Sequence, residues 1–318
     1  MSQTSVVGSP YWVDYLSTYC LEDHARVARF PSFRAAMSAP WRLFASKNII
    51  VLGHGVPNSA PLLVWFSLFV IIWVFGPRRP HFFMYWIGSE VPRRGARWQE
   101  AIYHWFATRE RVHLICGAPW FVEALAGRGL TAHPILFPYH ISPARALADV
   151  WPDESHLVAG TYLTPSHWEN SNGNWITALC REWPDVRWRI IGMTREEAWG
   201  GLDKLENVDL CGWVPNPQQT MSECHVFLRL SRSDAYAGTA RDAQAMRRIV
   251  FFTKPVGDCI EVSATNPDDC FKQFGRIVGV FAGSDSRSIA SLRSNGSRLP
   301  ELADSTKELI GYIRDKNA

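Results

Sequence analysis

The sequence predicts an α/β protein made of two Rossmann-like domains that face each other across a cleft. Three observations support this fold class. The chain has 318 residues, which is long for one hydrophobic core and suits two domains of about 150 residues each. Short apolar runs alternate with segments of helical periodicity, as expected for parallel β-α units. The alternation then begins a second time after an Ala- and Pro-containing stretch at 141–155.

The first domain is predicted at residues 1–150. Helical segments with apolar residues at helical spacing lie at 10–23, 32–46 and 97–110. Glycine residues follow several of the apolar runs and allow a tight turn from strand to helix. The predicted strands of this domain are 4–8, 48–55, 81–88, 111–117 and 133–139.

The second domain is predicted at residues 151–318, with the boundary inside 141–156. It repeats the alternation of the first domain without repeating its sequence. Its predicted strands are 156–163, 186–192, 208–214, 225–230 and 249–255. Its predicted helices are 174–184, 217–224 and 238–248.

Composition excludes several classes of protein. Hydrophobic residues make up 47% of the chain and charged residues 20%, which is typical of a folded globular protein. The formal charge of +3 and the absence of any Lys/Arg run longer than two residues argue against a nucleic-acid partner. Seven scattered cysteines without a C-x-x-C pair argue against a disulfide framework and a zinc site. The first residues lack a secretion signal, so we expect a cytoplasmic protein.

An uncharged segment at 60–75 raises the question of a membrane span. As a helix, its 16 residues would reach roughly 24 Å, less than the roughly 30 Å of a hydrocarbon core. The favoured interpretation is a helix packed on the sheet of the first domain. The alternatives are peripheral contact of one apolar face with the inner face of the cytoplasmic membrane, and a full span.

The stretch from His225 to Phe252 contains two carboxylates, Asp234 and Asp242, on either side of Gly238. In a continuous helix they would lie about 12 Å apart, which is too far for the acid pair of a glycoside hydrolase at about 5–9.5 Å. Gly238 instead predicts a loop followed by a helix that begins near Thr239, with backbone N–H groups available for a phosphate. Asp234 would then lie in the loop and Asp242 in the first helical turn, where carboxylates can accept hydrogen bonds from a sugar and a ribose.

The segment "DAYAGTARDAQAM" at 234–246 resembles the E-x(7)-E motif of retaining GT-B glycosyltransferases of bacterial surface polysaccharide synthesis, with Asp at both acidic positions. The flanking segments 207–230 and 249–262 resemble the strands and loops before and after that motif. In the first domain, 84–91 resembles a W-I-G-[ST]-D strand end of the same transferases. The specific matches are confined to 84–91 and 187–262.

The resemblance implies a GT-B hexosyltransferase that moves a sugar from a nucleotide-sugar donor to a polyprenyl-linked or growing surface glycan, with retention. The donor would bind the second domain and the acceptor the first, and neither a metal nor a cofactor is expected. The loop after the first strand of the second domain lacks the Lys or Arg that many relatives place there. Arg229 and Arg232 are the nearest replacements, and Arg binds a diphosphate with two donors at once.

The predicted site residues come from this resemblance and from positions at the carboxyl ends of predicted strands, where open α/β sheets bind ligands. Asp234 and Glu90 are the predicted catalytic carboxylates. The predicted acceptor-side residues are Gly8 and His54, although either could serve a structural role. The predicted donor-binding residues are Arg229, Arg232, Gly238, Thr239 and Asp242. Replacing Asp242 with Ala is expected to weaken donor binding and to leave the melting temperature almost unchanged.

Two other functions remain open at this point. The Asp-for-Glu substitutions favour a catalytically degenerate GT-B protein that binds a nucleotide-sugar or glycan as the partner of an active transferase. A sugar-nucleotide epimerase of similar architecture would need further histidines and carboxylates that the sequence does not place. An assay of transfer or donor hydrolysis, compared with donor binding alone, separates the first alternative from an active enzyme.

Overall fold

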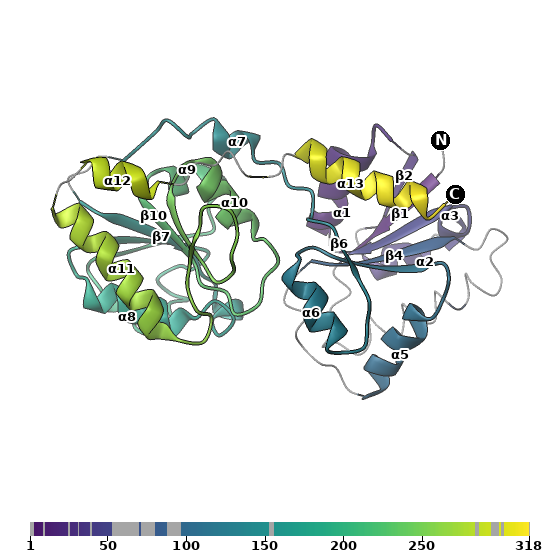
Figure 1. Ribbon diagram of the computed structural model, residues 1–318, viewed down its shortest axis with the longest axis horizontal. Coiled ribbons are helices and arrows are strands. Elements are labelled where there is room, and N and C mark those ends of the chain that lie inside the picture. The colour runs from purple at the N-terminus through teal and green to yellow at the C-terminus, as the bar shows by residue number, and fades with distance from the viewer. Residues whose placement is uncertain are drawn as a thin grey trace. The chain divides into compact units, whose positions relative to one another are not determined.

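The chain forms two compact α/β units in the computed structural model (Figure 1). Unit 1 comprises 1–140, 233–236 and 300–318, and unit 2 comprises 141–232 and 237–299. Each unit has its own six-stranded sheet in which all neighbouring strands are parallel. The predicted pair of separate parallel sheets is therefore confirmed. The structure describes residues 3–8, 10–24, 26–30, 32–38, 40–52, 70, 80–87, 97–152, 156–283, 286–293, 299 and 302–317.

The sheet of unit 1 has the strand order β2-β1-β3-β4-β5-β6. Its strands are β1 (Gln3–Val7), β2 (Arg26–Phe30), β3 (Asn48–Leu52), β4 (His81–Trp86), β5 (Val112–Cys116) and β6 (His133–Pro134). β2 was not predicted, because this edge strand has two arginines and only one buried residue. β6 is shorter than the predicted 133–139, since Pro134 and Pro138 have no N–H to donate to a sheet.

Both faces of this sheet are buried, so its central strands read as continuous apolar runs. Successive residues of β3 show how the two faces alternate: Ile49 and Val51 join one apolar cluster, and Ile50 and Leu52 join the other. The helices of unit 1 are α1 (Pro10–Leu16), η1 (Ser17–Leu21, a π-helical turn), α2 (Phe33–Ser38), α3 (Pro40–Phe44), α5 (Arg97–Ala107), α6 (Trp120–Ala126) and α13 (Leu302–Asp315).

Helix α13 belongs to unit 1, although it lies at the end of the sequence. Its Leu309 and Ile313 are buried in the same cluster as Ile50 and Leu52 of β3. The predicted second domain, which ran from 151 to 318, therefore differs from unit 2 at its C-terminal end. The physical reason is that the apolar face of α13 covers one face of the unit 1 sheet.

The sheet of unit 2 has the strand order β12-β11-β10-β7-β8-β9. Its strands are β7 (Val158–Tyr162), β8 (Arg187–Ile191), β9 (Val208–Gly212), β10 (Val226–Arg229), β11 (Ile249–Phe252) and β12 (Ile260–Glu261). Its helices are α7 (Ser142–Arg145), η2 (Pro165–His167, 3-10), α8 (Gly173–Glu182), η3 (Leu202–Lys204, 3-10), α9 (Pro217–Ser222), α10 (Gly238–Ala245), α11 (Pro267–Ala282) and α12 (Ser286–Leu292). β12, α11 and α12 extend the fold beyond the elements that the sequence predicted.

Apolar side chains of α8 and α11 cover one face of the unit 2 sheet. Trp188 of β8 is fully buried, and its ring stacks on Phe274 of α11 with centroids 5.2 Å apart. Asn266 caps α11 by accepting a hydrogen bond from the backbone N–H of Asp268, and Pro267 occupies the first helical position. These signals, together with Asp268 and Asp269 in the first turn, explain where this helix begins.

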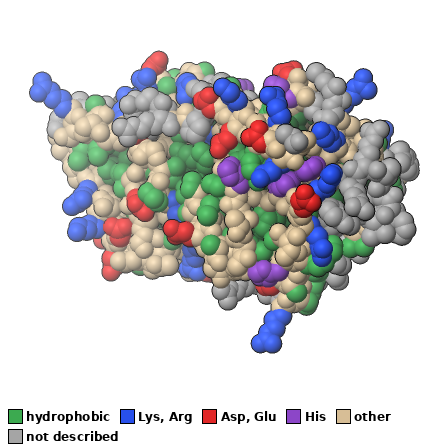
Figure 2. Space-filling model, turned by 45° about the vertical axis from the view of Figure 1, so that its right-hand side comes forward, with side chains coloured by type: hydrophobic (Ala, Val, Ile, Leu, Met, Phe, Trp, Pro, Cys, Tyr) green, Lys and Arg blue, Asp and Glu red, His purple; other side chains and the backbone are tan. Residues whose placement is uncertain are grey.

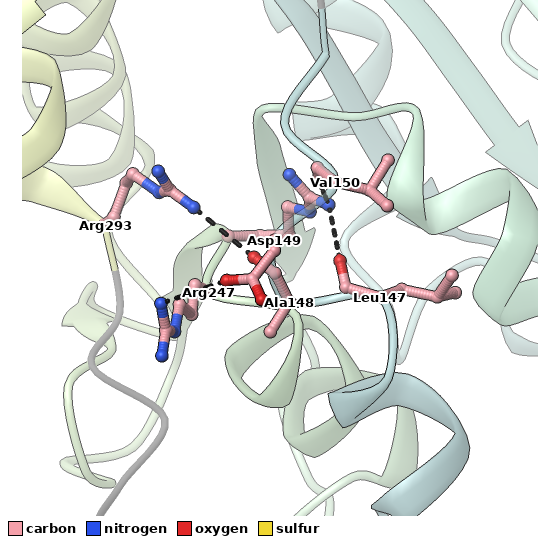
Figure 3. A network of polar contacts seen from close by, with 7 residues as sticks. Leu147, Ala148, Asp149, Val150, Arg247 and Arg293 are labelled. Carbon is pink, nitrogen blue, oxygen red and sulfur yellow. Dashed lines mark hydrogen bonds and ion pairs between the residues drawn. The ribbon is translucent and has the colours of Figure 1, made fainter.

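Three arginines hold the segment between α7 and β7 within unit 2 (Figure 3). Arg248 is fully buried and donates to the carbonyl oxygens of Leu147 (3.4 Å) and Val150. Arg293 donates to the carbonyl oxygen of Ala148 (3.4 Å), and Arg247 pairs with Asp149 (3.4 Å). The following residue, Trp151, receives the guanidinium groups of Arg248 and Arg293 on its ring. Unit 2 begins at residue 141, the first residue of the predicted boundary region, whereas the second domain was predicted to begin at residue 151.

No helix in the described part of the chain is both long enough and apolar enough to cross a bilayer. The predicted helix at 60–75 lies outside the described residues except for Val70.

Two histidines meet at the amino edge of the unit 1 sheet. The Nδ1 atom of His81 lies 2.9 Å from Nε2 of His113, and the two rings stack with centroids 5.3 Å apart. Burial lowers the pKa of His113 to about 4, and the nearby His81 and Lys316 act in the same direction. Burial is also the main cause that lowers the pKa of His81. The pair shares one hydrogen bond only while at least one ring is neutral.

Because the pKa of each histidine of this pair is lowered, we expect unit 1 to lose stability in mild acid. In the unfolded chain a histidine binds its proton near pH 6.5, whereas folded His113 does so only near pH 4. Between these values the unfolded chain binds more protons, so the free energy of unfolding falls as the pH falls from about 6.5 towards 4. We expect His113→Gln to lose less stability than the wild type between pH 7 and 5 in urea unfolding. Equal losses in the two proteins would contradict the assignment.

Candidate functional site

The strand order of each sheet locates its ligand-binding edge. In an open parallel sheet, ligands bind outside the carboxyl ends of the strands where the strand order reverses. In unit 2 this reversal lies between β7 and β10, and in unit 1 between β1 and β3. The unit 2 site is therefore expected at the ends of β7 and β10, which carry Tyr162 and Arg229.

Asn172 joins the two loops that follow β7 and β10. Its Nδ2 donates to the carbonyl oxygens of Leu230 (2.9 Å) and Ala264 (3.3 Å), and its Oδ1 accepts from Nε of Arg232 (2.8 Å). The backbone N–H of Arg232 also donates to the carbonyl oxygen of Asn170 (2.7 Å). Because Asn172 is only 2% exposed, these bonds are shielded from water and fix the loop geometry.

Asn172 was not among the predicted site residues. Its backbone is left-handed, with φ of 50°, and it immediately precedes the first residue of α8. Asn tolerates this conformation better than most residues. The Asn-Gly dipeptide at 172–173 was the signal in the sequence that could have identified this turn.

Arg229 and Arg232 both lie at the carboxyl end of β10. The guanidinium of Arg229 lies over the ring of Tyr162 at 5.6 Å, and its Nη1 donates to the Tyr162 carbonyl oxygen (3.4 Å). Arg232 is exposed, and its Nε bond to Asn172 orients the guanidinium. Two arginines at a strand-order reversal form a site suited to an anion with several oxygens.

An aromatic surface lies beside these arginines. Trp213, which follows β9, is 69% exposed and contacts Tyr162 edge-to-face with ring centroids 5.9 Å apart. Burial raises the pKa of Tyr162, and the charge of Arg229 acts in the opposite direction, so the phenol remains protonated at neutral pH. An exposed indole of this kind can cover the apolar face of a sugar or a base.

The helix predicted after Gly238 is present as α10, which begins at Gly238. Gly238 and Thr239 lie in its first turn and are partly exposed. The N-cap residue, Ala237, makes no side-chain hydrogen bond to this end of the helix, so the first backbone N–H groups can donate to a ligand. Asp242 is the fifth residue of this helix and not the predicted fourth, because the helix starts at Gly238 and not at Thr239. It therefore lies at the start of the second turn.

Asp242 is a buried residue of unit 2. Its side chain is 2% exposed, and Oδ2 accepts a hydrogen bond from Nε2 of Gln218 in α9 at 2.9 Å. Burying a carboxylate without such donors would be costly. The sequence expectation that Asp242→Ala leaves the melting temperature almost unchanged is therefore replaced by a stability cost.

Asp234 lies in unit 1, as part of the short segment 233–236. Its carbonyl oxygen accepts a hydrogen bond from the indole Nε1 of Trp120 at 2.9 Å. Ala235 is buried in the apolar cluster that contains Trp86 and Phe121. The two acids of the motif thus belong to different units, whereas the sequence analysis placed both in the second domain.

Gly8 lies at the carboxyl end of β1, at the strand-order reversal of unit 1. A Cβ atom at this position would approach the carbonyl oxygen of Leu52 to 2.6 Å, which real side chains do not tolerate. Gly8 therefore permits β1 and β3 to end close together. The other two residues predicted in this domain, His54 and Glu90, lie outside the described residues.

The described residues contain no group of three or more His, Cys, Asp or Glu side chains arranged to hold a metal ion. The arginines at the end of β10 are the cationic groups that the structure places at the unit 2 site.

No protein-family model matches the sequence, and no curated protein does. Solved structures match it along its whole length. HepE of Anabaena, in complex with UDP and glucose, has a TM-score of 0.71 and 12% identity, over 99% of this chain and 100% of HepE. Sucrose-phosphate synthase of Thermosynechococcus elongatus has a TM-score of 0.67 and 11% identity, over 99% of each chain. A glycosyltransferase of Rickettsia africae has a TM-score of 0.66 and 8% identity, over 99% of this chain and 98% of the other.

At these identities the similarity establishes the fold. The fold is GT-B. Its two Rossmann-like sheets confirm the fold class predicted from the alternation of strands and helices. The structural neighbours are glycosyltransferases.

Proposed function

We propose that this protein is a glycosyltransferase that moves a sugar from a nucleotide-sugar donor to an acceptor glycan. The observation that carries the proposal is the pair Arg229 and Arg232 at the strand-order reversal of a GT-B unit. A full-length structural match, HepE, was solved with UDP, with UDP-glucose, and with UDP and glucose. Such ligands carry the diphosphate that two arginines at this edge would bind.

In this proposal the donor binds unit 2. Arg229 and Arg232 hold the diphosphate, and the first N–H groups of α10, at Gly238 and Thr239, contact the phosphate nearest to them. As the glycosidic bond breaks, negative charge builds up on the departing diphosphate. Fixed cations and N–H dipoles stabilise this charge without reorganising, so the proposal requires neither a metal nor a cofactor.

The finer features of the proposal come from the resemblance of 234–246 to the E-x(7)-E motif. They are retention of configuration, a hexosyl donor, and a polyprenyl-linked or growing surface glycan as acceptor in polysaccharide biosynthesis. Asp234 and Glu90 are the proposed catalytic carboxylates, and Gly8 and His54 the acceptor-side residues. A cytoplasmic protein in peripheral contact with the membrane would meet such an acceptor at the inner face of that membrane.

A second candidate is a GT-B protein that binds the donor without turnover. The burial of Asp242 favours it, because a carboxylate that accepts from Gln218 and is 2% exposed is partly committed to the fold. At both acidic positions the aspartate side chain is also one methylene group shorter than the glutamate of the E-x(7)-E motif, so it reaches less far towards a ligand.

The test combines binding with turnover. We expect UDP or another nucleoside diphosphate, at about 100 times its dissociation constant, to stabilise the protein by about 2.7 kcal/mol. Donor hydrolysis or transfer by the same sample identifies an enzyme. Binding without either reaction identifies the second candidate. If no nucleoside diphosphate or nucleotide-sugar stabilises the protein, both are wrong.

Asp242 variants separate the structural role of this residue from a role in donor binding. Asp242→Ala leaves Nε2 of Gln218 without its acceptor, so we expect the free energy of unfolding to fall by about 1–3 kcal/mol. Asp242→Asn keeps an oxygen for Gln218 and should recover most of that stability. If Asp242 binds the ribose, calorimetry should show that both variants bind the nucleotide at least tenfold more weakly than the wild type. The reason is that a hydrogen bond to a charged acceptor is worth about 1.5–3 kcal/mol. Wild-type affinity in Asp242→Asn would contradict the ribose contact.

A further inference from the structure

A small cavity of about 200 Å³ lies at the amino edge of the unit 1 sheet. Thr4 in β1 and Asn48, the first residue of β3, line it and are almost fully buried. Nδ2 of Asn48 is 3.5 Å from Oγ1 of Thr4, and Oδ1 of Asn48 accepts from Nδ2 of Asn317 at 3.0 Å. The cavity is therefore closed on one side by a fixed group of polar side chains. Gly8 and the strand-order reversal lie at the other edge of the same sheet.

Three basic side chains from three separate elements line this cavity. They are His24 in the turn after η1, Lys47 before β3, and Arg314 in α13. All three are exposed, and within the described part of the chain none of them forms an ion pair. Among the described residues that line this cavity there is no carboxylate. Figure 2 shows a face of the protein on which histidine, basic and acidic side chains lie close together.

Basic side chains that gather around one hollow raise the local concentration of anions. The guanidinium, the ammonium and the imidazole would approach an anion from three sides. A tetrahedral phosphoryl group offers an oxygen to each of them, and Arg pairs with phosphate through two parallel bonds. A carboxylate has only two oxygens to share among the same three donors. The arrangement therefore suits a phosphoryl group better than a carboxylate.

A larger cavity of about 660 Å³ adjoins the small one and shares His24, Ile310 and Arg314 with it. The wall includes the ring of Tyr19, Ile310 and Gly311, and Lys307 also lines it. Glu22 and Asp23 are its carboxylates, and Glu22 pairs with Arg29 at 3.6 Å. Its volume falls in the range of sites for small molecules. Its largely apolar wall would contact the body of a ligand whose charged group occupies the small cavity.

We propose that these two cavities form a binding site for a phosphate monoester, separate from the donor site. Lys47, Arg314 and His24 hold the phosphoryl group, and the wall formed by Tyr19, Ile310 and Gly311 holds the organic part. The described residues that line the two cavities all belong to unit 1, whereas Arg229 and Arg232 belong to unit 2. The site is therefore independent of the proposed glycosyltransferase activity.

The first test is calorimetry with glucose 6-phosphate and inorganic phosphate, in the presence of saturating UDP to occupy any donor site. We expect the ester to bind more tightly than inorganic phosphate, because only the ester contacts the larger cavity. The double variant Lys47→Gln/Arg314→Gln should bind both ligands at least tenfold more weakly than the wild type, since it removes two charged hydrogen-bond donors. The matched control, Arg187→Gln/Lys272→Gln, removes two exposed charges from unit 2 and should bind as the wild type does.

The second test fills the larger cavity. A Cβ atom at Gly311 meets no atom within 4 Å and Gly311 lines the larger cavity, so Gly311→Phe introduces a ring at this wall without a clash at its Cβ atom. We expect this variant to lose affinity for glucose 6-phosphate and to retain affinity for inorganic phosphate. Gly279 in α11 of unit 2 also has open space at its Cβ, so Gly279→Phe is the control.

Sedimentation with vesicles that contain phosphatidic acid, a lipid whose headgroup is itself a phosphate monoester, distinguishes the source of the phosphoryl group. Binding of the soluble ester that is lost in Lys47→Gln/Arg314→Gln supports a free metabolite. Vesicle binding that is lost in the same variant, without binding of the soluble ester, supports a lipid headgroup in the same cavity. The proposal is overturned if neither ligand binds, or if both double variants weaken binding equally, which would indicate only nonspecific attraction of anions.

Discussion

Replacing Asn172 with alanine is expected to lower the free energy of unfolding of unit 2 by about 3 kcal/mol. The variant leaves the carbonyl oxygens of Leu230 and Ala264 without the buried donor that they now have, which costs about 1–3 kcal/mol. It also places alanine at φ of 50°, which costs roughly 1–2 kcal/mol. Urea unfolding of the wild type and of Asn172→Ala measures the sum.

Asn172→Gly separates these two contributions. Glycine adopts the left-handed conformation without steric cost, so this variant should lose the hydrogen bonds and recover roughly 1 kcal/mol relative to alanine. Both variants also remove the oxygen that accepts the hydrogen bond from Nε of Arg232, so its guanidinium is no longer held in one orientation. We therefore expect both variants to bind a nucleoside diphosphate more weakly than the wild type. Equal stability of the wild type and Asn172→Ala would mean that this side chain does not join the two loops.

Replacing Arg229 or Arg232 with alanine is expected to weaken nucleoside diphosphate binding roughly 10- to 100-fold. Each change removes a charge-assisted hydrogen-bond donor, which is worth about 1.5–3 kcal/mol. The double variant should lose close to the product of the two factors and show no transfer. Arg232→Lys should be intermediate, because lysine keeps the charge and lacks the two-pronged geometry. Titration calorimetry with UDP measures all four proteins.

Arg187→Ala is the matched control for this series. Arg187 is exposed at the first residue of β8, and therefore at the amino edge of the same sheet. We expect its affinity for UDP and its melting temperature to stay close to those of the wild type. If Arg229→Ala and Arg232→Ala bind UDP as tightly as Arg187→Ala, the diphosphate site lies elsewhere and the proposed function loses its main support.

Local sequence signals determined much of what was predicted correctly. Apolar runs of strand length and helical spacing are properties of neighbouring residues, so they identified ten strands and the parallel α/β class. Arg229 and Arg232 follow such a run directly. Their place at the carboxyl end of β10 could therefore be read from the chain. Gly238 likewise predicted the start of α10 to within one residue.

The tertiary structure alone decided which distant segments meet. Asn172 bonds to residues 58 and 92 positions away, and no local pattern encodes such partners. Trp120 and Asp234 are 114 positions apart in the sequence. The hydrogen bond between them joins the segment 233–236 to the rest of unit 1. The apolar face of α13 could have covered either sheet, and packing placed it on unit 1. Burial and long-range hydrogen bonds depend on the fold as a whole. For this reason the sequence predicted the two sheets and the position of Arg229 and Arg232 at the end of β10. Only the structure revealed the hydrogen bonds by which Asn172 joins two loops, the burial of Asp242 and the basic cavity beneath α13.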